Sequence, residues 1–165
     1  MKVAIAGAGA VGTFVANDLR EANHEIVLIE KNPDLAARLR PTLDVQWFVG
    51  DACEVANLQE AGIADADVMV AATGEDQVNL VISLLAKQEF AVPRVVARVN
   101  NPKNQWMFNE MWGVDVSVST EKPVPSTLCG EVAPPMAAAR AEWKSTSERL
   151  KPGVLALERL FASTC

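Results

Sequence analysis

Three glycines near the beginning of the chain have the spacing of a phosphate-binding turn. Gly7, Gly9 and Gly12 form a G-x-G-x-x-G pattern between a short apolar run and an apolar helical segment. In such a turn the first glycine allows the tight bend, the second leaves room for a pyrophosphate, and the third lets the helix pack closely on the strand. The first N–H groups of the helix are free to bind the phosphates. The three glycines therefore predict a nucleotide site.

An acidic residue stands where the ribose of such a nucleotide is expected. Glu30 ends the second apolar run, at about the 20-residue distance from the glycines that the dinucleotide fingerprint requires. A carboxylate there accepts hydrogen bonds from the 2′- and 3′-hydroxyls and repels a 2′-phosphate. The alternative is a solvated acid at a strand end, and we favour the ribose role because the glycines are in register. Because the positively charged Lys31 is next to Glu30, the sequence does not settle whether NADP is excluded.

Further polar positions are expected at the same edge of the fold. Asp51 could accept a hydrogen bond from an adenine amino group or cap the next helix. The backbone of Thr73 and Gly74 should lie near the pyrophosphate or the distal ribose. Asn79, in the first turn of the following helix, could reach the ligand or remain an exposed polar residue. Arg98 interrupts an apolar strand and needs an acid or a phosphate as partner, and from the residues alone we favour a structural pairing.

The residues that catalysis usually requires are scarce. The chain has no tyrosine, which excludes a short-chain dehydrogenase of the Tyr-x-x-x-Lys kind. The single histidine, His24, precedes the second strand, away from the ligand edge, and is expected to be a surface turn residue. The three cysteines form neither a zinc pattern nor a disulfide framework, which suits a reducing cytosol. We therefore expect no catalytic residues and no metal site.

Composition limits the possible partners. The net charge of −6 argues against a nucleic-acid partner, because phosphate backbones bind to basic surfaces. No apolar run approaches the roughly 20 residues that span a bilayer, so we expect no direct membrane insertion. Half of the 165 residues are hydrophobic, enough for one domain with a sizeable core and an appendage.

The elements that position these residues alternate regularly. Strand-like apolar runs are expected at 3–6, 25–30, 45–49, 68–72, 93–100 and 114–118. Helical segments are expected at 10–22, 33–40, 55–61 and 77–89, with a further helix starting at Asn101-Pro102. The alternation predicts an α/β, Rossmann-like, doubly wound parallel sheet of six strands in the order 3-2-1-4-5-6.

Residues 121–165 differ in character from the rest. Prolines crowd the stretch after residue 121, and only a helix at 136–150 and a short amphipathic segment at 154–161 are indicated. We expect a nucleotide-binding domain at 1–120 and an atypical proline-containing arm or linker at 121–165. The arm would be helical or partly disordered and could pack on a partner subunit.

Several motifs that follow one another along the chain support a family resemblance. They are Gly-Ala-Gly-Ala-Val-Gly12, Val-Leu-Ile-Glu-Lys-Asn-Pro33, Val-Gly-Asp-Ala52, Ala-Asp-Val-Met-Val-Ala-Ala-Thr-Gly74, Asp-Gln-Val-Asn-Leu80, Arg-Val-Val-Ala-Arg-Val-Asn-Asn-Pro102 and Trp-Gly-Val-Asp115. In this order they resemble the N-terminal nucleotide-binding domain of TrkA-type potassium-uptake regulators, the RCK or KTN domain. The glycine turn is shared with many dehydrogenases, whereas the motifs after the third and fifth strands are more specific.

The resemblance implies a ligand and a set of contacts. It implies that the phosphates lie at Gly7, Gly9, Ala10, Val11 and Gly12; the adenosine ribose at Glu30, with Lys31 beside it; the adenine at Asp51 and Ala52; and the far side of the ligand at Thr73, Gly74 and Asn79. Arg98 matches a family arginine near the ligand or the dimer contact, which favours a ligand-linked role. NAD(H) is the implied ligand, with ADP, AMP or ATP as alternatives. ATP-preferring relatives often carry Arg at the position of Ala10, so we favour a dinucleotide, ADP or AMP.

The resemblance also implies a function. It implies a cytosolic regulatory subunit that gates a membrane-embedded potassium transporter or channel without catalysis, as a homodimer or higher homo-oligomer held at the inner face of the membrane by its partner. We expect the C-terminal lobe of the family to be absent. The alternative is a small NAD-dependent oxidoreductase or a dehydrogenase cofactor domain. Hydride transfer usually needs a substrate pocket and a proton donor, and the cofactor fold uses nearly the whole chain.

Overall fold

A computed structural model describes residues 1–119 of the chain. The expected arm at 121–165, with its two helical segments, lies outside the described residues. Within the described part, no helix is long and apolar enough to cross a membrane.

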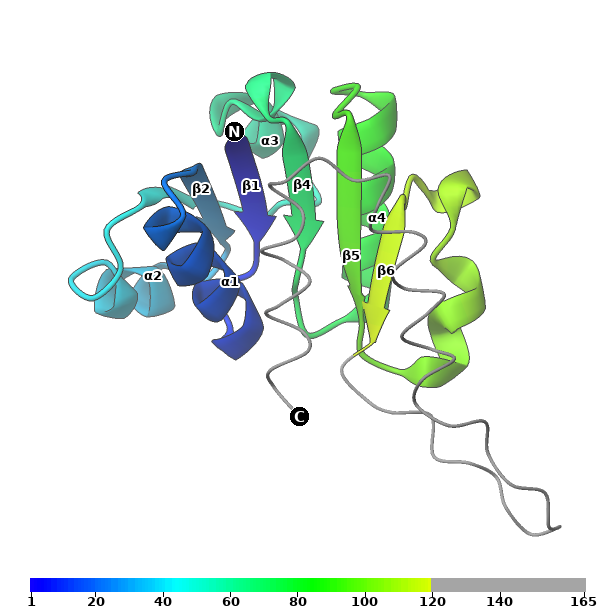
Figure 1. The fold of residues 1–165 in the computed structure, drawn as a ribbon, viewed down its shortest axis with the longest axis horizontal. Coiled ribbons are helices and arrows are strands. Elements are labelled where there is room, and N and C mark those ends of the chain that lie inside the picture. Colours follow the sequence, from blue (N-terminus) through cyan, green and yellow to red (C-terminus); the bar gives the residue numbers. More distant parts are fainter. Residues whose placement is uncertain (120–165) are drawn as a thin grey trace, which may run out of the picture.

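One parallel sheet of six strands organises the described residues (Figure 1). The strands are β1 (Lys2–Ala6), β2 (Glu25–Glu30), β3 (Gln46–Val49), β4 (Val68–Ala71), β5 (Arg94–Val99) and β6 (Val116–Ser119). Their spatial order is β3-β2-β1-β4-β5-β6, and every neighbouring pair is parallel. The predicted Rossmann-like topology is confirmed. All carboxyl ends of the strands therefore meet at one edge of the sheet.

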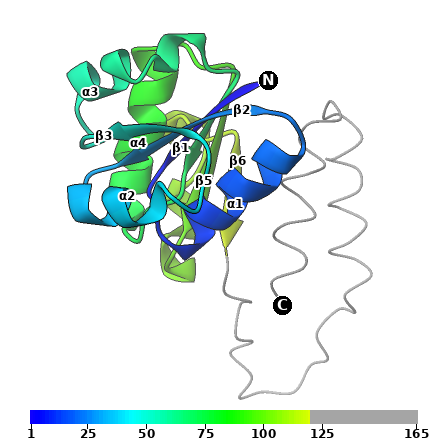
Figure 2. The same ribbon diagram turned by 90° about the vertical axis from the view of Figure 1, so that its left-hand side faces the viewer.

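Helices cover both faces of the sheet, as the edge-on view in Figure 2 shows. Residues 1–119 contain four α-helices, α1 (Ala10–Glu21), α2 (Pro33–Leu39), α3 (Val55–Glu60) and α4 (Asp76–Gln88). The same part of the chain has three 3₁₀ helices, η1 (Ile63–Asp65), η2 (Pro102–Met107) and η3 (Glu110–Trp112). Helix α2 begins as the sequence indicates, because the Asn32 side chain accepts from the N–H groups of Asp34 and Leu35 and Pro33 fills the first turn.

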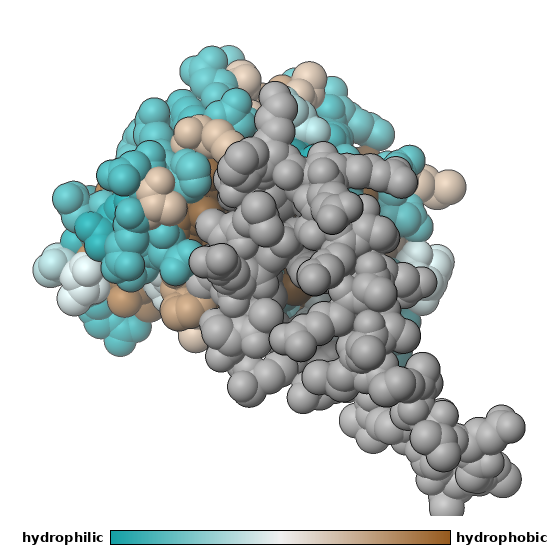
Figure 3. Space-filling model, viewed as in Figure 1, coloured by the Kyte–Doolittle hydropathy of each residue, from teal (hydrophilic) through white to brown (hydrophobic). Residues whose placement is uncertain are grey.

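Two apolar clusters lie on opposite faces of the sheet. Along β1, Val3 and Ile5 belong to the cluster that contains the buried residues of α1, and Ala4 and Ala6 belong to the cluster that contains those of α3 and α4. Burial on both faces explains why the strands appear in the sequence as continuous apolar runs. On the face seen in Figure 3, the described surface over α1 and α2 is mainly hydrophilic.

The segment after β5 differs from the prediction of a continuous helix. It forms the two short 3₁₀ helices η2 and η3, neither of which buries a residue. Only Met107 of η2 and Trp112 of η3 pack partly against the core, so a longer α-helix there would gain little stabilisation from packing. The Asn109 side chain caps η3 by accepting from Met111 N, and Gly113 ends it with a φ of 72°. The sixth strand then begins at Val116, two residues later than expected, because the Asp115 side chain is occupied with Val95 N.

Candidate functional site

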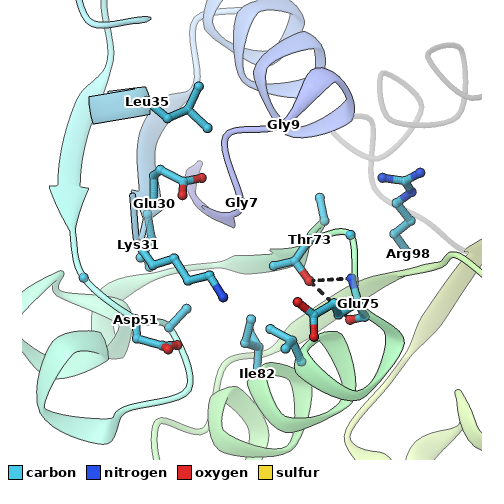
Figure 4. Close-up of a pocket in the computed structure, with 16 residues that line it drawn as sticks. Gly7, Gly9, Glu30, Lys31, Leu35, Asp51, Thr73, Glu75, Ile82 and Arg98 are labelled. Carbon is cyan, nitrogen blue, oxygen red and sulfur yellow. Dashed lines mark hydrogen bonds between the residues drawn. The ribbon is translucent and has the colours of Figure 1, made fainter. Parts of the chain in front are cut away.

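A pocket of about 300 Å³ opens at the carboxyl edge of the strands (Figure 4). The predicted site residues that line it are Gly7, Gly9, Glu30, Lys31, Asp51, Ala52, Thr73, Gly74 and Arg98. Its other lining residues are Ile29, Leu35, Gly50, Ala72, Glu75, Val78 and Ile82. The fold thus brings together residues from five different strand ends, with polar side chains from four of them, as the doubly wound topology requires.

The glycine turn has the geometry that its spacing predicts at two positions. Gly7 has a φ of 99°, and its N–H donates to the Ile29 carbonyl at 2.8 Å. A Cβ at Gly7 would lie 3.1 Å from the Thr73 Cα, so the turn lies against the end of β4. A Cβ at Gly12 would lie 1.9 Å from the Gly7 carbonyl oxygen. Only glycine allows α1 to approach the turn this closely.

Gly9 differs from the other two glycines because it faces open space. Nothing lies within 4 Å of the position where its Cβ would stand, and its φ of −70° is accessible to any residue. The predicted phosphate contacts Ala10, Val11 and Gly12 are not among the residues that line the pocket. Within residues 1–119, their N–H groups make no hydrogen bond, since the first main-chain bond of α1 runs from Thr13 to Gly9. These are the free donors at the start of the helix.

Glu30 is fixed by the main chain rather than solvated. The residue is 8% exposed; Ala8 N donates to its Oε2 at 2.8 Å, and Asn32 N donates to its Oε1 at 2.8 Å. The alternative of a solvated strand-end acid is therefore wrong. A carboxylate offers about four acceptor positions, so each oxygen keeps one for a ligand. In Figure 4 the carboxylate lies across from Gly7, at the mouth of the glycine turn.

Asp51 and Ala52 line the pocket after β3, the strand that pairs with the strand of Glu30. Cys53 N donates to Asp51 Oδ1 at 2.8 Å, and the residue at the start of α3 is Glu54, which makes no side-chain cap. Asp51 therefore shapes the turn before α3 and does not cap the helix, so the capping alternative is wrong. The adenine contact stays a prediction. Burial, together with the nearby Asp51 carboxylate, raises the pKa of the Cys53 thiol, which leaves it neutral.

Asn79 lies behind the pocket and not in it. The residue is fully buried, so the alternative of an exposed polar residue is wrong. Its Oδ1 accepts from Thr73 N at 2.9 Å and from Thr73 Oγ1 at 2.7 Å, and its Nδ2 donates to the Arg98 carbonyl at 2.9 Å. Asn79 thus contacts two residues that line the pocket without lining it itself.

Arg98 lines the pocket from β5, on the far side of Thr73 from Glu30 (Figure 4). The ion pairs formed within residues 1–119 do not include it, so the structural pairing with an acid is not found there. Its Nε is buried and makes no hydrogen bond in this part of the chain. A buried guanidinium N–H without a partner costs free energy, which an anion at this end of the pocket would recover.

Some lining residues had no specific signal in the sequence. Val78 and Ile82 lie one turn apart on α4, and such apolar pairs are indistinguishable from core residues by pattern. Glu75 precedes α4 and is exposed, although it lines the pocket. With Glu30 and Asp51 it adds a third carboxylate beside the two cations, Lys31 and Arg98.

Asp76 holds the segment that follows β5. It is 4% exposed and accepts from Asn100 N at 2.6 Å, Asn101 N at 3.0 Å and Asn104 Nδ2 at 2.7 Å. Burial alone raises the pKa of Asp76, but the hydrogen bonds from Asn100, Asn104 and Asn101 outweigh it and hold the pKa below its ordinary value.

We expect this carboxylate to make stability depend on acid pH. A folded-state pKa below the unfolded value of about 3.9 adds stability above that pH, and the gain is lost as the pH falls through the folded pKa. Asp76→Asn should lower the free energy of unfolding by about 2 kcal/mol at pH 7, and this difference should shrink below about pH 4. Urea unfolding between pH 3 and 7 measures it, with the exposed Asp44→Asn as control. If the difference in the free energy of unfolding between wild type and Asp76→Asn does not change with pH, the lowered pKa of Asp76 is contradicted.

Comparisons with known proteins agree with this architecture. Residues 3–120 match the family model described as the TrkA-N domain. The Trk system potassium uptake protein TrkA of Mycobacterium tuberculosis (strain H37Rv) is 57% identical over 129 residues, which are 78% of this chain and 58% of the relative. A TrkA homolog of Methanothermobacter thermautotrophicus is 38% identical over 122 residues, covering 74% of this chain and 56% of the homolog. The chain thus spans under two thirds of the length of these relatives.

Solved structures share the fold at low identity. A GsuK channel bound to NAD has a TM-score of 0.64 at 20% identity, over 71% of this chain and 21% of the channel chain. The Kef C-terminal domain of Shewanella denitrificans in its AMP-bound form has a TM-score of 0.63 at 20% identity, over 97% of this chain and 89% of that chain. These likenesses support the architecture alone.

Proposed function

The chain belongs to the TrkA-N domain family, a non-catalytic regulatory family, and from that premise we propose that it is the nucleotide-binding regulatory domain of a potassium uptake system. It binds NAD(H) and gates a membrane-embedded potassium transporter or channel. It acts in the cytoplasm as a homodimer or higher homo-oligomer, at the inner face of the membrane through its partner. The names of the TrkA relatives support the potassium system, and the NAD-bound and AMP-bound structures of neighbouring proteins support the ligand class.

One observation carries the proposal for the ligand. Glu30, whose carboxylate is fixed by two main-chain N–H groups, lines one pocket together with Gly7 and Gly9, and the free N–H donors of α1 follow directly after Gly9. The donors at Ala10, Val11 and Gly12 suit a pyrophosphate, and the fixed acceptors of Glu30 suit a ribose diol. Because the Glu30 carboxylate cannot swing away, it repels a 2′-phosphate even with Lys31 next to it. We therefore propose NAD(H) or a short adenine nucleotide, and not NADP.

We propose the remaining contacts from the residues that line the pocket. In this proposal Asp51 and Ala52 contact the adenine, with Val78 and Ile82 as its apolar surroundings, and the Thr73–Gly74 backbone and Arg98 contact the phosphates or the distal ribose. Asn79 acts on the ligand through Thr73. ADP or AMP would use the same contacts without the distal end.

The oxidoreductase alternative receives no support from a specific observation. The comparisons connect the chain to a non-catalytic family, and His24 lies in the turn before β2, at the edge of the sheet opposite the pocket. An assay of NADH fluorescence with candidate substrates tests the alternative, since turnover would contradict the regulatory proposal.

We expect the substitution Gly9→Ala to weaken nucleotide binding without unfolding the domain. Because no atom lies within 4 Å of the added Cβ and the φ of −70° suits alanine, the free energy of unfolding should change by no more than about 1 kcal/mol. The methyl group points into the pocket where the pyrophosphate is proposed to lie, so affinity for NADH and ADP should fall about tenfold or more. Isothermal titration calorimetry measures the affinity and urea unfolding the stability. Wild-type affinity in a folded Gly9→Ala would overturn the phosphate placement.

A further inference from the structure

The first turns of α4 bury polar side chains that lie outside the pocket. Asp76 is 4% exposed, and Asn79 and Ser83 have no exposed surface. An amphipathic helix normally turns apolar residues to the core, and a buried polar group costs free energy unless its hydrogen bonds are made. The hydrogen-bond partners of these side chains therefore indicate why they are buried.

Asn79 makes all its side-chain bonds to two residues of the pocket wall. Its Oδ1 accepts from Thr73 N and Oγ1, and its Nδ2 donates to the carbonyls of Thr73 at 3.3 Å and Arg98 at 2.9 Å. Both Thr73 and Arg98 line the pocket (Figure 4). Asn79 thus sets the separation between the end of β4 and the end of β5, which lie side by side in the sheet.

The Thr73 carbonyl also connects the pocket wall to the segment after β5. Asn100 Nδ2 donates to the Thr73 carbonyl at 3.1 Å, while Asn100 N donates to Asp76 at 2.6 Å. Asp76 in turn binds Asn101 and Asn104, and Asn104 belongs to η2. None of Asp76, Asn100 and Asn104 lines the pocket. We call the side chains of Asp76, Asn79 and Asn100 the polar corner.

We propose that Asn79 and Asn100 are positioning residues for the nucleotide and that the polar corner couples nucleotide binding to local opening of η2. The inference rests on the proposed nucleotide-binding function. A ligand that contacts Thr73 favours the arrangement in which the Thr73 carbonyl accepts from both asparagines. The same arrangement holds Asn100 against Asp76 and so holds η2 closed.

Linkage makes the coupling reciprocal. If nucleotide binding lowers the equilibrium constant for the opening of η2 by some factor, holding η2 closed raises nucleotide affinity by the same factor. Removing the Asn100 side chain cuts the connection at the Thr73 carbonyl and leaves the main-chain bond from Asn100 N to Asp76 in place. Because Asn100 is half-buried and lies outside the pocket, its replacement by alanine should leave the domain folded.

The test compares Asn100→Ala with Gln105→Ala, using NADH and ADP as probes. Both residues carry a side-chain amide, but Gln105 belongs to η2 and donates to Ser117 Oγ at 2.6 Å, whereas Asn100 bonds to Thr73. Calorimetry gives the affinities. Hydrogen exchange of the amides in η2, with and without saturating probe, gives the opening, and the amides of η1 serve as an internal reference far from the corner.

We expect the probe to slow exchange in wild-type η2 about fivefold or more, beyond any change in η1. Asn100→Ala should lose this slowing and bind the probe about fivefold more weakly, whereas Gln105→Ala should keep the slowing and bind within about twofold of wild type. A second variant, Ser83→Ala, removes a buried bond to the Asn79 carbonyl and should lower stability without changing affinity. Unchanged affinity and slowing in Asn100→Ala would overturn the coupling. Failure of wild type to bind either probe would instead overturn the proposed function.

Discussion

Gly12→Ala is expected to leave the domain largely unfolded. The added Cβ would lie 1.9 Å from the Gly7 carbonyl oxygen and 3.1 Å from the Gly7 carbonyl carbon, and neither atom belongs to a flexible side chain. Relief requires α1 to move away from the turn, which would open the cluster that contains Val15 and Leu19. We expect a loss of more than about 4 kcal/mol, most of the stability of a typical domain.

Circular dichroism and urea unfolding measure this effect. Gly9→Ala is the matched control, since it adds the same methyl group to the same turn without a contact within 4 Å. The control should fold and lose affinity, whereas Gly12→Ala should lose the fold. A Gly12→Ala protein that unfolds within about 1 kcal/mol of wild type would show that the turn and α1 can separate cheaply.

Glu30→Gln is expected to reduce affinity for NADH and ADP about 100-fold. Hydrogen bonds from two ribose hydroxyls to a carboxylate contribute about 1.5–3 kcal/mol each, and the amide keeps only one acceptor oxygen. The loss of charge also removes the repulsion of a 2′-phosphate, so the preference for NADH over NADPH should narrow. Calorimetry with both dinucleotides gives the two affinities and their ratio.

Glu25→Gln is the control for this measurement. Glu25 begins the same strand that Glu30 ends, is exposed and lies at the edge away from the pocket. It should bind both dinucleotides as wild type does. If Glu30→Gln binds NADH as tightly as Glu25→Gln, the ribose assignment fails and the ligand must lie elsewhere in the pocket.

Much of the fold could be predicted because local and global signals agree. The bounds of β2 match the apolar run at 25–30, and the order of the sheet follows from right-handed crossovers between parallel strands. The roles of Gly7 and Gly12 follow from the spacing of the turn. The prediction of secondary structure fails where the conformation of a segment depends on the residues that it packs against. The residues after Asn101 have helical starting signals, but of η2 and η3 only Met107 and Trp112 pack partly against the core, and the segment forms two short 3₁₀ helices.

The site is less predictable than the fold because a side chain's direction is a tertiary property. Asn79 stands at a helix start, where either a ligand contact or solvent exposure is reasonable, and the structure buries it against Thr73 instead. Val78 and Ile82 belong to the apolar stripe of α4, and the sequence does not distinguish the members of this stripe that line the pocket from those that face only the core. Arg98 forms no ion pair within residues 1–119, and the acids Glu30, Asp51 and Asp76 accept hydrogen bonds from main-chain N–H groups.

The two main-chain bonds of Glu30 have a consequence for cofactor engineering. A single substitution that removes the acid to admit NADP would also leave Ala8 N and Asn32 N without their acceptor. Each abandoned donor costs about 1–3 kcal/mol if water cannot reach it. A substitution of Glu30 therefore changes the cofactor preference and the stability of the glycine turn at the same time. A design that switches the cofactor has to supply a new acceptor for both donors first, and only then a basic group for the additional phosphate.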